Sequence, residues 1–123
     1  MTQDSKTMTD IQIYHNPRCS KSRQTLALIE EQGITPEIIL YLDNTPNEAE
    51  LKTVLQKLGI SARELLRKGE QDYKDHKLSD LSLSEAQLVE KMIAFPKLIE
   101  RPIVIKGAKA VLGRPPENVL NLL

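Results

Sequence analysis

The chain has 123 residues, 40% of them hydrophobic, and its 17 lysines and arginines balance its 17 aspartates and glutamates. This length and composition fit one folded domain with a hydrophobic core, and the balanced charge does not point to nucleic acid or a membrane surface as a partner. One cysteine excludes an intrachain disulfide. No segment is long and apolar enough for a transmembrane helix or a signal-peptide core, so the sequence predicts a cytoplasmic protein.

The first third of the chain predicts a strand–helix–strand unit. Residues 1–9 are polar and are expected to form a flexible N-terminal tail. The apolar run 11–14 predicts a buried strand, and the periodic stretch of about 20–32 predicts a helix that ends at Gly33. Residues 37–41 predict a second strand, buried and parallel to the first.

The middle of the chain predicts helices. Capping boxes at 45–48, 61–64 and 84–87 each open a helical pattern, the first with proline as its first helical residue. The first of these helices is expected to stop at Gly59, and the second to run to about residue 67. Residues 68–81 are polar and predict a loop with one turn of helix.

The end of the chain returns to strands. Residues 103–105 and 110–112 predict a hairpin, and the segment after Gly113 predicts a last helix. The resulting order is βαβ, helices, ββα. It predicts an α/β class, thioredoxin-like fold with a helical insertion at about 45–95, in a single domain spanning 10–123.

The chemistry of the sequence centres on Cys19, which lies where a loop enters a helix. The N–H groups of a helix's first turn have no intrahelical partner, and the helix dipole adds positive charge there. Arg18, Lys21 and Arg23 add cations nearby. These surroundings favour a thiolate, and the polar, basic context argues against a buried, inert cysteine.

Two windows of the sequence carry basic residues and no acidic ones. They are residues 11–29, which include Cys19, and residues 101–116. In a thioredoxin-like fold the residue just before the third strand faces the cysteine loop and precedes a cis proline, so Arg101 and Pro102 are expected there. A guanidinium can bind two oxygens of a tetrahedral oxyanion, which predicts an anion site.

Other ligand sites have weaker support. The two histidines and one cysteine show no zinc-type spacing, and there is no phosphate-binding loop or dinucleotide motif, so no tightly bound cofactor is expected.

His15 either forms a structural hydrogen bond at the end of its strand or supports the ionised Cys19 by hydrogen bonding or by its charge.

Several separated motifs in the same order resemble the glutaredoxin-linked arsenate reductase (ArsC) family, most closely its short YfgD-like members. The similarity runs from about residue 11 to residue 123. Its markers are His15-Asn16-Pro17-x-Cys19-x-x-Ser22-Arg23, Leu40-Tyr41-Leu42, Leu65-Leu66-Arg67-Lys68, Arg101-Pro102-Ile103-Val104 and Arg114-Pro115.

The resemblance implies an arsenate reductase with one catalytic cysteine, Cys19, and His15 and Ser22 as its supporting residues. It also implies three arginines that bind the arsenic oxyanion, namely Arg67, Arg101 and Arg114. Asn16, Arg18, Arg23 and Pro102 complete the predicted site as a secondary group. Because the chain has no second thiol to regenerate the sulfur, glutathione is expected as co-substrate and glutaredoxin as partner.

Two alternatives remain open. The Spx transcription regulators share this fold and bind RNA polymerase, but their usual Cys-x-x-Cys switch would need a cysteine where this chain has Ser22. Arg18, Ser20 and Lys21 stand where the best-studied arsenate reductases tend to have small neutral residues. This difference leaves room for another oxyanion, or a protein mixed disulfide, as the substrate of a thiol-dependent reductase.

Overall fold

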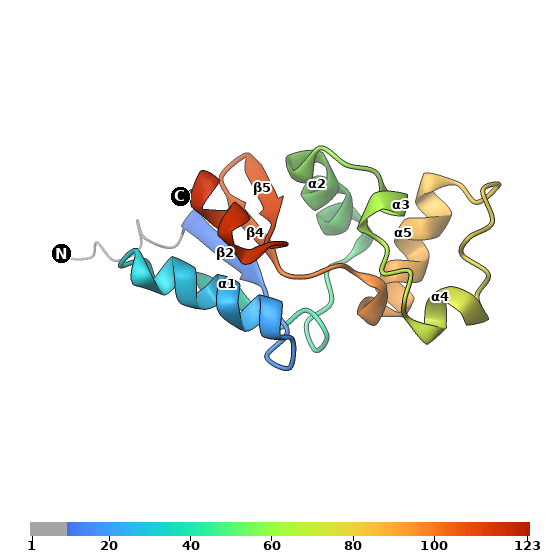
Figure 1. The fold of residues 1–123 in the computed structure, drawn as a ribbon. Coiled ribbons are helices and arrows are strands. Elements are labelled where there is room, and N and C mark those ends of the chain that lie inside the picture. The colour runs from blue at the N-terminus through green and yellow to red at the C-terminus, as the bar shows by residue number, and fades with distance from the viewer. Residues whose placement is uncertain (1–9) are drawn as a thin grey trace. The chain divides into compact units, whose positions relative to one another are not determined.

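A computed structural model describes residues 10–123, so the predicted tail at 1–9 lies outside the described residues. The chain divides into two compact units, each described by itself below (Figure 1). The sheet unit contains the chain up to Tyr41 together with Arg101–Leu123, and the helical unit is Leu42–Glu100. The prediction of one domain over 10–123 stays a prediction.

The sheet unit has the thioredoxin-like α/β fold expected from the sequence. Its four strands are β2 (Ile11–Tyr14), β3 (Glu37–Ile39), β4 (Ile103–Lys106) and β5 (Lys109–Leu112). They lie in the order β3-β2-β4-β5. Strand β3 is parallel to β2, whereas β4 is antiparallel to β2 and to β5, so the sheet is mixed. The predicted β4–β5 hairpin is therefore confirmed.

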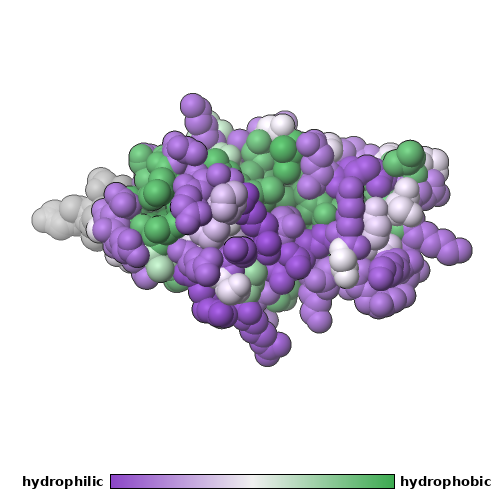
Figure 2. All heavy atoms as spheres, in the orientation of Figure 1, coloured by the Kyte–Doolittle hydropathy of each residue, from purple (hydrophilic) through white to green (hydrophobic). Residues whose placement is uncertain are grey.

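The core of the sheet unit lies between the sheet and two helices, α1 (Ser20–Glu31) and η3 (Pro116–Asn121). The last predicted helix is thus a 3₁₀ helix. Alternate residues of β2 point to this face, and they pack with side chains from both helices and from β4. The buried members of this cluster are Ile11, Ile13, Ile29, Val104 and Val119. Figure 2 shows hydrophobic atoms at the surface near the C-terminus, where the partly buried Leu122 and Leu123 pack against this cluster.

The predicted burial of the second strand is wrong. Strand β3 pairs only with β2 among the described strands and lies at the edge of the sheet. Glu37 is exposed and Ile38 is 45% exposed. An apolar run predicts burial on both faces of a strand, but position within the sheet decides whether neighbouring elements cover it.

The helical unit contains α2 (Glu48–Leu58), α3 (Ala62–Leu65), α4 (Gln71–Asp75), α5 (Glu85–Ala94) and η2 (Pro96–Leu98). Capping boxes open three of these helices. Those of Ser61 with Glu64 and Ser84 with Gln87 are the predicted ones. The first helix is instead capped by Asn47, whose side chain accepts a hydrogen bond from the Glu50 backbone N–H, so α2 begins two residues later than predicted.

Two helices of this unit end in different ways. Gly59 ends α2 in the left-handed conformation, with φ of 71°, as expected for a C-cap glycine. Helix α3 ends at Leu65, earlier than predicted, because Leu66 pairs with Ile99 in an isolated antiparallel bridge.

Between residues 10 and 123, no helix combines the length and apolar character needed to span a bilayer.

Candidate active site

Cys19 is the N-cap residue of α1, at the position predicted from the sequence. Its backbone is extended, with φ of −94° and ψ of 122°. Its N–H donates to the Asn16 carbonyl oxygen over 3.0 Å, which closes the loop between β2 and the helix. The side chain therefore stands beside the N–H groups of the first helical turn, which have no carbonyl partner within the helix.

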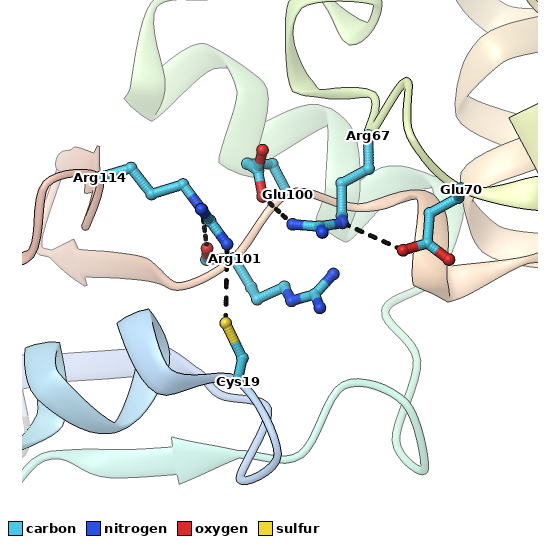
Figure 3. A network of polar contacts seen from close by, with 6 residues as sticks. All are labelled: Cys19, Arg67, Glu70, Glu100, Arg101 and Arg114. Carbon is cyan, nitrogen blue, oxygen red and sulfur yellow. Dashed lines mark hydrogen bonds and ion pairs between the residues drawn. The ribbon is translucent and has the colours of Figure 1, made fainter.

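Two guanidinium groups from the C-terminal part of the sheet unit approach the sulfur. Arg114 Nη2 lies 3.6 Å from Cys19 Sγ, and Figure 3 shows the sulfur directed toward this guanidinium. Arg114 Nε donates to the Arg101 carbonyl oxygen over 2.7 Å, which holds the two arginine segments together. The Arg101-Pro102 peptide bond is cis, as expected, and the Arg101 guanidinium lies near enough to the sulfur to lower the pKa of Cys19. The role of Arg101 as an oxyanion ligand stays a prediction.

The balance of these contacts favours the thiolate form of Cys19. Burial acts first and raises the pKa of the thiol, because it penalises the charged form. The Ser22 backbone N–H, the Arg101 guanidinium and the Lys21 backbone N–H lower the pKa, and together they outweigh burial. The net result is a pKa below the ordinary cysteine value, as a nucleophilic cysteine requires.

Two expectations about the surroundings of the sulfur are wrong. Cys19 is 9% exposed, so its polar sequence context does not keep it at the surface. The side chains of Arg18, Lys21 and Arg23 are exposed, and Arg23 Nη1 donates to the Pro17 carbonyl oxygen rather than to the sulfur. None of these three side chains is among the groups that shift the pKa of Cys19, and the guanidiniums that reach the sulfur come from the far end of the sequence.

His15, Asn16 and Ser22 form a buried hydrogen-bonded group beneath the cysteine loop. His15 Nδ1 lies 2.6 Å from Ser22 Oγ, and the Asn16 backbone N–H donates to the same oxygen over 3.0 Å. Because Oγ accepts from Asn16, its own proton is available to a neutral His15 Nδ1. The group ties the end of β2 to the first turn of α1, and this favours the structural alternative for His15.

The second hypothesis for His15, that its positive charge supports the Cys19 thiolate, is not favoured by its surroundings. Burial lowers the pKa of His15, and the nearby charge of Arg23 lowers it further, while Glu30 partly opposes them. The imidazole is therefore neutral over a wider pH range than a free histidine, so it orients Ser22 instead of supplying a positive charge to the thiolate.

The stability of the protein should consequently depend on His15 in mild acid. Because the pKa of His15 is lower when folded, the unfolded chain binds the proton more readily as the pH falls through about 6.5. The free energy of unfolding is expected to decrease between about pH 7.5 and pH 5.5, and to decrease less in His15→Gln. Urea unfolding of both proteins at each pH measures this; equal slopes would contradict it.

Arg67, the remaining predicted arginine, belongs to the helical unit and is already paired there. Its Nη1 lies 2.6 Å from Glu100 Oε1 and its Nε 3.4 Å from Glu70 Oε2 (Figure 3). The backbone brings the ion pair together, because the Arg67 N–H donates to Leu98 and the Glu100 N–H to Leu65 across the isolated bridge. The two carboxylates take two of five guanidinium N–H groups. The role of Arg67 as an oxyanion ligand stays a prediction.

One polar residue that holds the site was missed in the sequence. Asn118 Nδ2 donates to the carbonyl oxygens of Arg114 and Leu112, at 3.0 and 3.3 Å, and so supports the turn that presents Arg114. An asparagine in a polar segment gives no local signal of this role. Within residues 10–123, no cluster of three or more His, Cys, Asp and Glu side chains could hold a metal ion.

Comparison with known proteins assigns the family. The sequence pattern of the ArsC family matches residues 14–122, nearly the whole chain. The chain belongs to the ArsC family. This confirms the resemblance drawn from the motifs around Cys19 and the arginines.

Individual relatives are similar over most of their length. YfgD of Escherichia coli K12 is 53% identical over 114 residues, which cover 92% of this chain and 96% of YfgD. An arsenate reductase of Haemophilus influenzae is 51% identical, over 90% of this chain and 97% of its own. The solved structure of an arsenate reductase from Vibrio cholerae superposes with a TM-score of 0.90 at 51% identity, covering 92% and 97% of the two chains.

Proposed function

We propose that this protein is an arsenate reductase in which Cys19 is the nucleophile. The observation that carries the proposal is the sulfur at the N-cap of α1, which contacts the guanidiniums of Arg101 and Arg114 and has a lowered pKa. The names of the relatives from Haemophilus influenzae and Vibrio cholerae support arsenate as the substrate. An oxyanion beside this sulfur would meet the positive charge that it needs.

In the first step, the Cys19 thiolate attacks the arsenic atom of arsenate. A sulfur–arsenic bond forms, and one arsenate hydroxyl takes up a proton from the solvent and leaves as water, so that its arsenic–oxygen bond breaks. Arsenic stays in the +5 state in this step. Arg101 and Arg114 bind the oxygens, and their positive charge stabilises the additional negative charge that develops on them during attack.

In the second step, an external thiol reduces the adduct. A glutathione thiolate attacks the sulfur of Cys19, so that a sulfur–sulfur bond forms and the sulfur–arsenic bond breaks. The bonding pair remains on arsenic, which is reduced from +5 to +3 and leaves as arsenite. A glutaredoxin thiol then attacks the mixed disulfide and releases the Cys19 thiolate. The 123 residues contain no second cysteine that could perform this exchange.

We assign further roles to five of the other predicted residues. Arg67 is proposed as the third oxyanion ligand, on the resemblance to the family. His15 and Ser22 hold the cysteine loop through their hydrogen bond. Pro102 and Asn16 accept hydrogen bonds that fix the loops bearing the reacting groups, from the Gly113 and Cys19 backbone N–H groups respectively.

The proposal is tested by measuring arsenite formed from arsenate by the purified protein with glutathione and glutaredoxin. Repeated formation of arsenite is expected only when the protein and both thiol components are present, with one glutathione disulfide per arsenite; without glutaredoxin, each Cys19 is expected to release one arsenite at most. Omitting glutaredoxin is expected to trap Cys19 as a mixed disulfide with glutathione, detectable by mass spectrometry. Absence of arsenite together with reduction of a glutathionylated test protein would instead assign the thiol chemistry to protein mixed disulfides.

A further inference from the structure

Gly113, the residue before Arg114, has no space around it for a side chain. A Cβ atom placed on it would lie 2.5 Å from Thr25 Oγ1 and 2.8 Å from Pro102 Cγ. Real Cβ atoms essentially never approach other atoms within 3.0 Å. Gly113 does not have a positive φ, in contrast to Gly107 in the hairpin turn. Close packing, and not backbone conformation, therefore requires glycine at 113.

Thr25, on the other side of this contact, is held rigidly by the helix that carries the sulfur. It lies on α1, is fully buried, and donates from Oγ1 to the Lys21 carbonyl oxygen over 2.8 Å. Its second acceptor, the Gly113 carbonyl oxygen, lies 3.4 Å away. A hydroxyl has one proton, so the shorter bond to its own helix fixes the rotamer. Thr25 thus presents a fixed surface to Gly113.

Gly113 in turn is bonded to both segments that carry guanidiniums. Its N–H donates to the Pro102 carbonyl oxygen over 3.0 Å, directly after Arg101. Arg114 follows in the chain and reaches the sulfur with Nη2 at 3.6 Å. The helix that begins at Cys19 and the arginine segments therefore meet at the contact between Thr25 and Gly113.

We propose that Thr25 and Gly113 are positioning residues for the Cys19 thiolate, and that their close contact sets the separation of the sulfur from the Arg101 and Arg114 guanidiniums. In Gly113→Ala, the added Cβ would lie 2.5 Å from Thr25 Oγ1, and increasing that distance to an ordinary 3.4 Å would separate the two segments by about 0.9 Å. Charge-assisted hydrogen bonds weaken steeply as they lengthen, so the thiolate would lose stabilisation while its burial remained. The consequence for catalysis rests on the proposed function; the effect on the thiol does not.

The test compares Gly113→Ala with Gly107→Ala by the rate at which iodoacetamide alkylates Cys19. Cys19 of Gly113→Ala is expected to be alkylated about three- to tenfold more slowly than Cys19 of the wild type at pH 7, because a smaller fraction of the sulfur is thiolate. Gly107→Ala makes the same chemical change at an exposed site with φ of 60° and nothing within 4 Å. It is expected to lower the free energy of unfolding but to leave the alkylation rate unchanged.

A second variant identifies the contact and covers the case in which Gly113→Ala does not fold. Thr25→Ala in the Gly113→Ala background removes Oγ1 and Cγ2, two of the three nearest atoms to the new Cβ. The double variant is expected to fold, and its Cys19 is expected to be alkylated faster than that of Gly113→Ala. If Gly113→Ala is unfolded, the rate for the double variant is expected to lie within threefold of that for Thr25→Ala.

Three results would overturn the positioning role. They are a folded Gly113→Ala that alkylates at the wild-type rate, a Gly107→Ala that slows alkylation equally, and a double variant that remains unfolded or recovers no rate. Alkylation needs neither arsenate nor glutathione. Failure of the arsenite assay therefore leaves this test intact, and failure of this test leaves the assignment of the substrate intact.

Discussion

A Cys19→Ser variant is expected to form no arsenite above the uncatalysed background, a loss of more than about a thousandfold. A serine hydroxyl is a weak nucleophile at neutral pH, and its oxygen cannot enter the disulfide through which the electrons reach arsenic. The guanidiniums of Arg101 and Arg114 remain, so an oxyanion can still bind. Turnover and binding should therefore separate: arsenite is measured in the coupled assay, and binding by titration calorimetry with arsenate.

The control for this variant is Ser20→Ala, which changes the exposed neighbour of Cys19 in the chain and leaves the thiol in place. It is expected to keep wild-type turnover, while both variants keep the circular dichroism spectrum of the wild type. Arsenite formed by Cys19→Ser at a tenth of the wild-type rate or faster would rule out the sulfur as the nucleophile.

The sequence predicts the strands and helices well where a local signal determines them. The boxes of Ser61 and Ser84 are confirmed because each cap is made by residues three apart in the chain. The first box fails because Thr45 and Asn47 compete as caps within three residues, and Asn47 has Glu50 at the matching position. The exposure of Glu37–Ile39 was not predictable from the local sequence, because it depends on which strands and helices pack around this strand.

The site divides in the same way. Cys19 and the Arg101-Pro102 segment could be assigned from the sequence, because a loop-to-helix cysteine and a proline before a strand are local patterns. The positive charge beside the sulfur could not be assigned from the residues next to Cys19, and Arg114 was implied only by the resemblance to the family. The nearest cations in sequence have exposed side chains, whereas Arg114, which reaches the sulfur, is 95 residues away. The contact of Thr25 with Gly113, across 88 residues, gives no signal in either local sequence.

Arg101→Ala is expected to raise the pKa of the Cys19 thiol. Burial, the largest influence on this group, opposes ionisation and would remain, while the hydrogen bond and the positive charge of the guanidinium would be lost. Because an ionised thiol is the nucleophile, the alkylation rate at pH 7 should fall by about tenfold. The pH dependence of alkylation by iodoacetamide measures the change, with a midpoint above that of the wild type.

The same substitution should reduce arsenite formation by more than the loss of thiolate explains. Arg101 is also proposed to bind the oxyanion, and removing one such donor costs about 10²- to 10³-fold in rate. Measuring kcat/KM at a pH where the thiol of each protein is fully ionised separates the two effects, because only the oxyanion contribution then remains. Lys109→Ala removes one positive charge from an exposed position on the hairpin and should change neither quantity. If raising the pH restored Arg101→Ala to the wild-type kcat/KM, Arg101 would serve the thiol alone and the oxyanion would need other ligands.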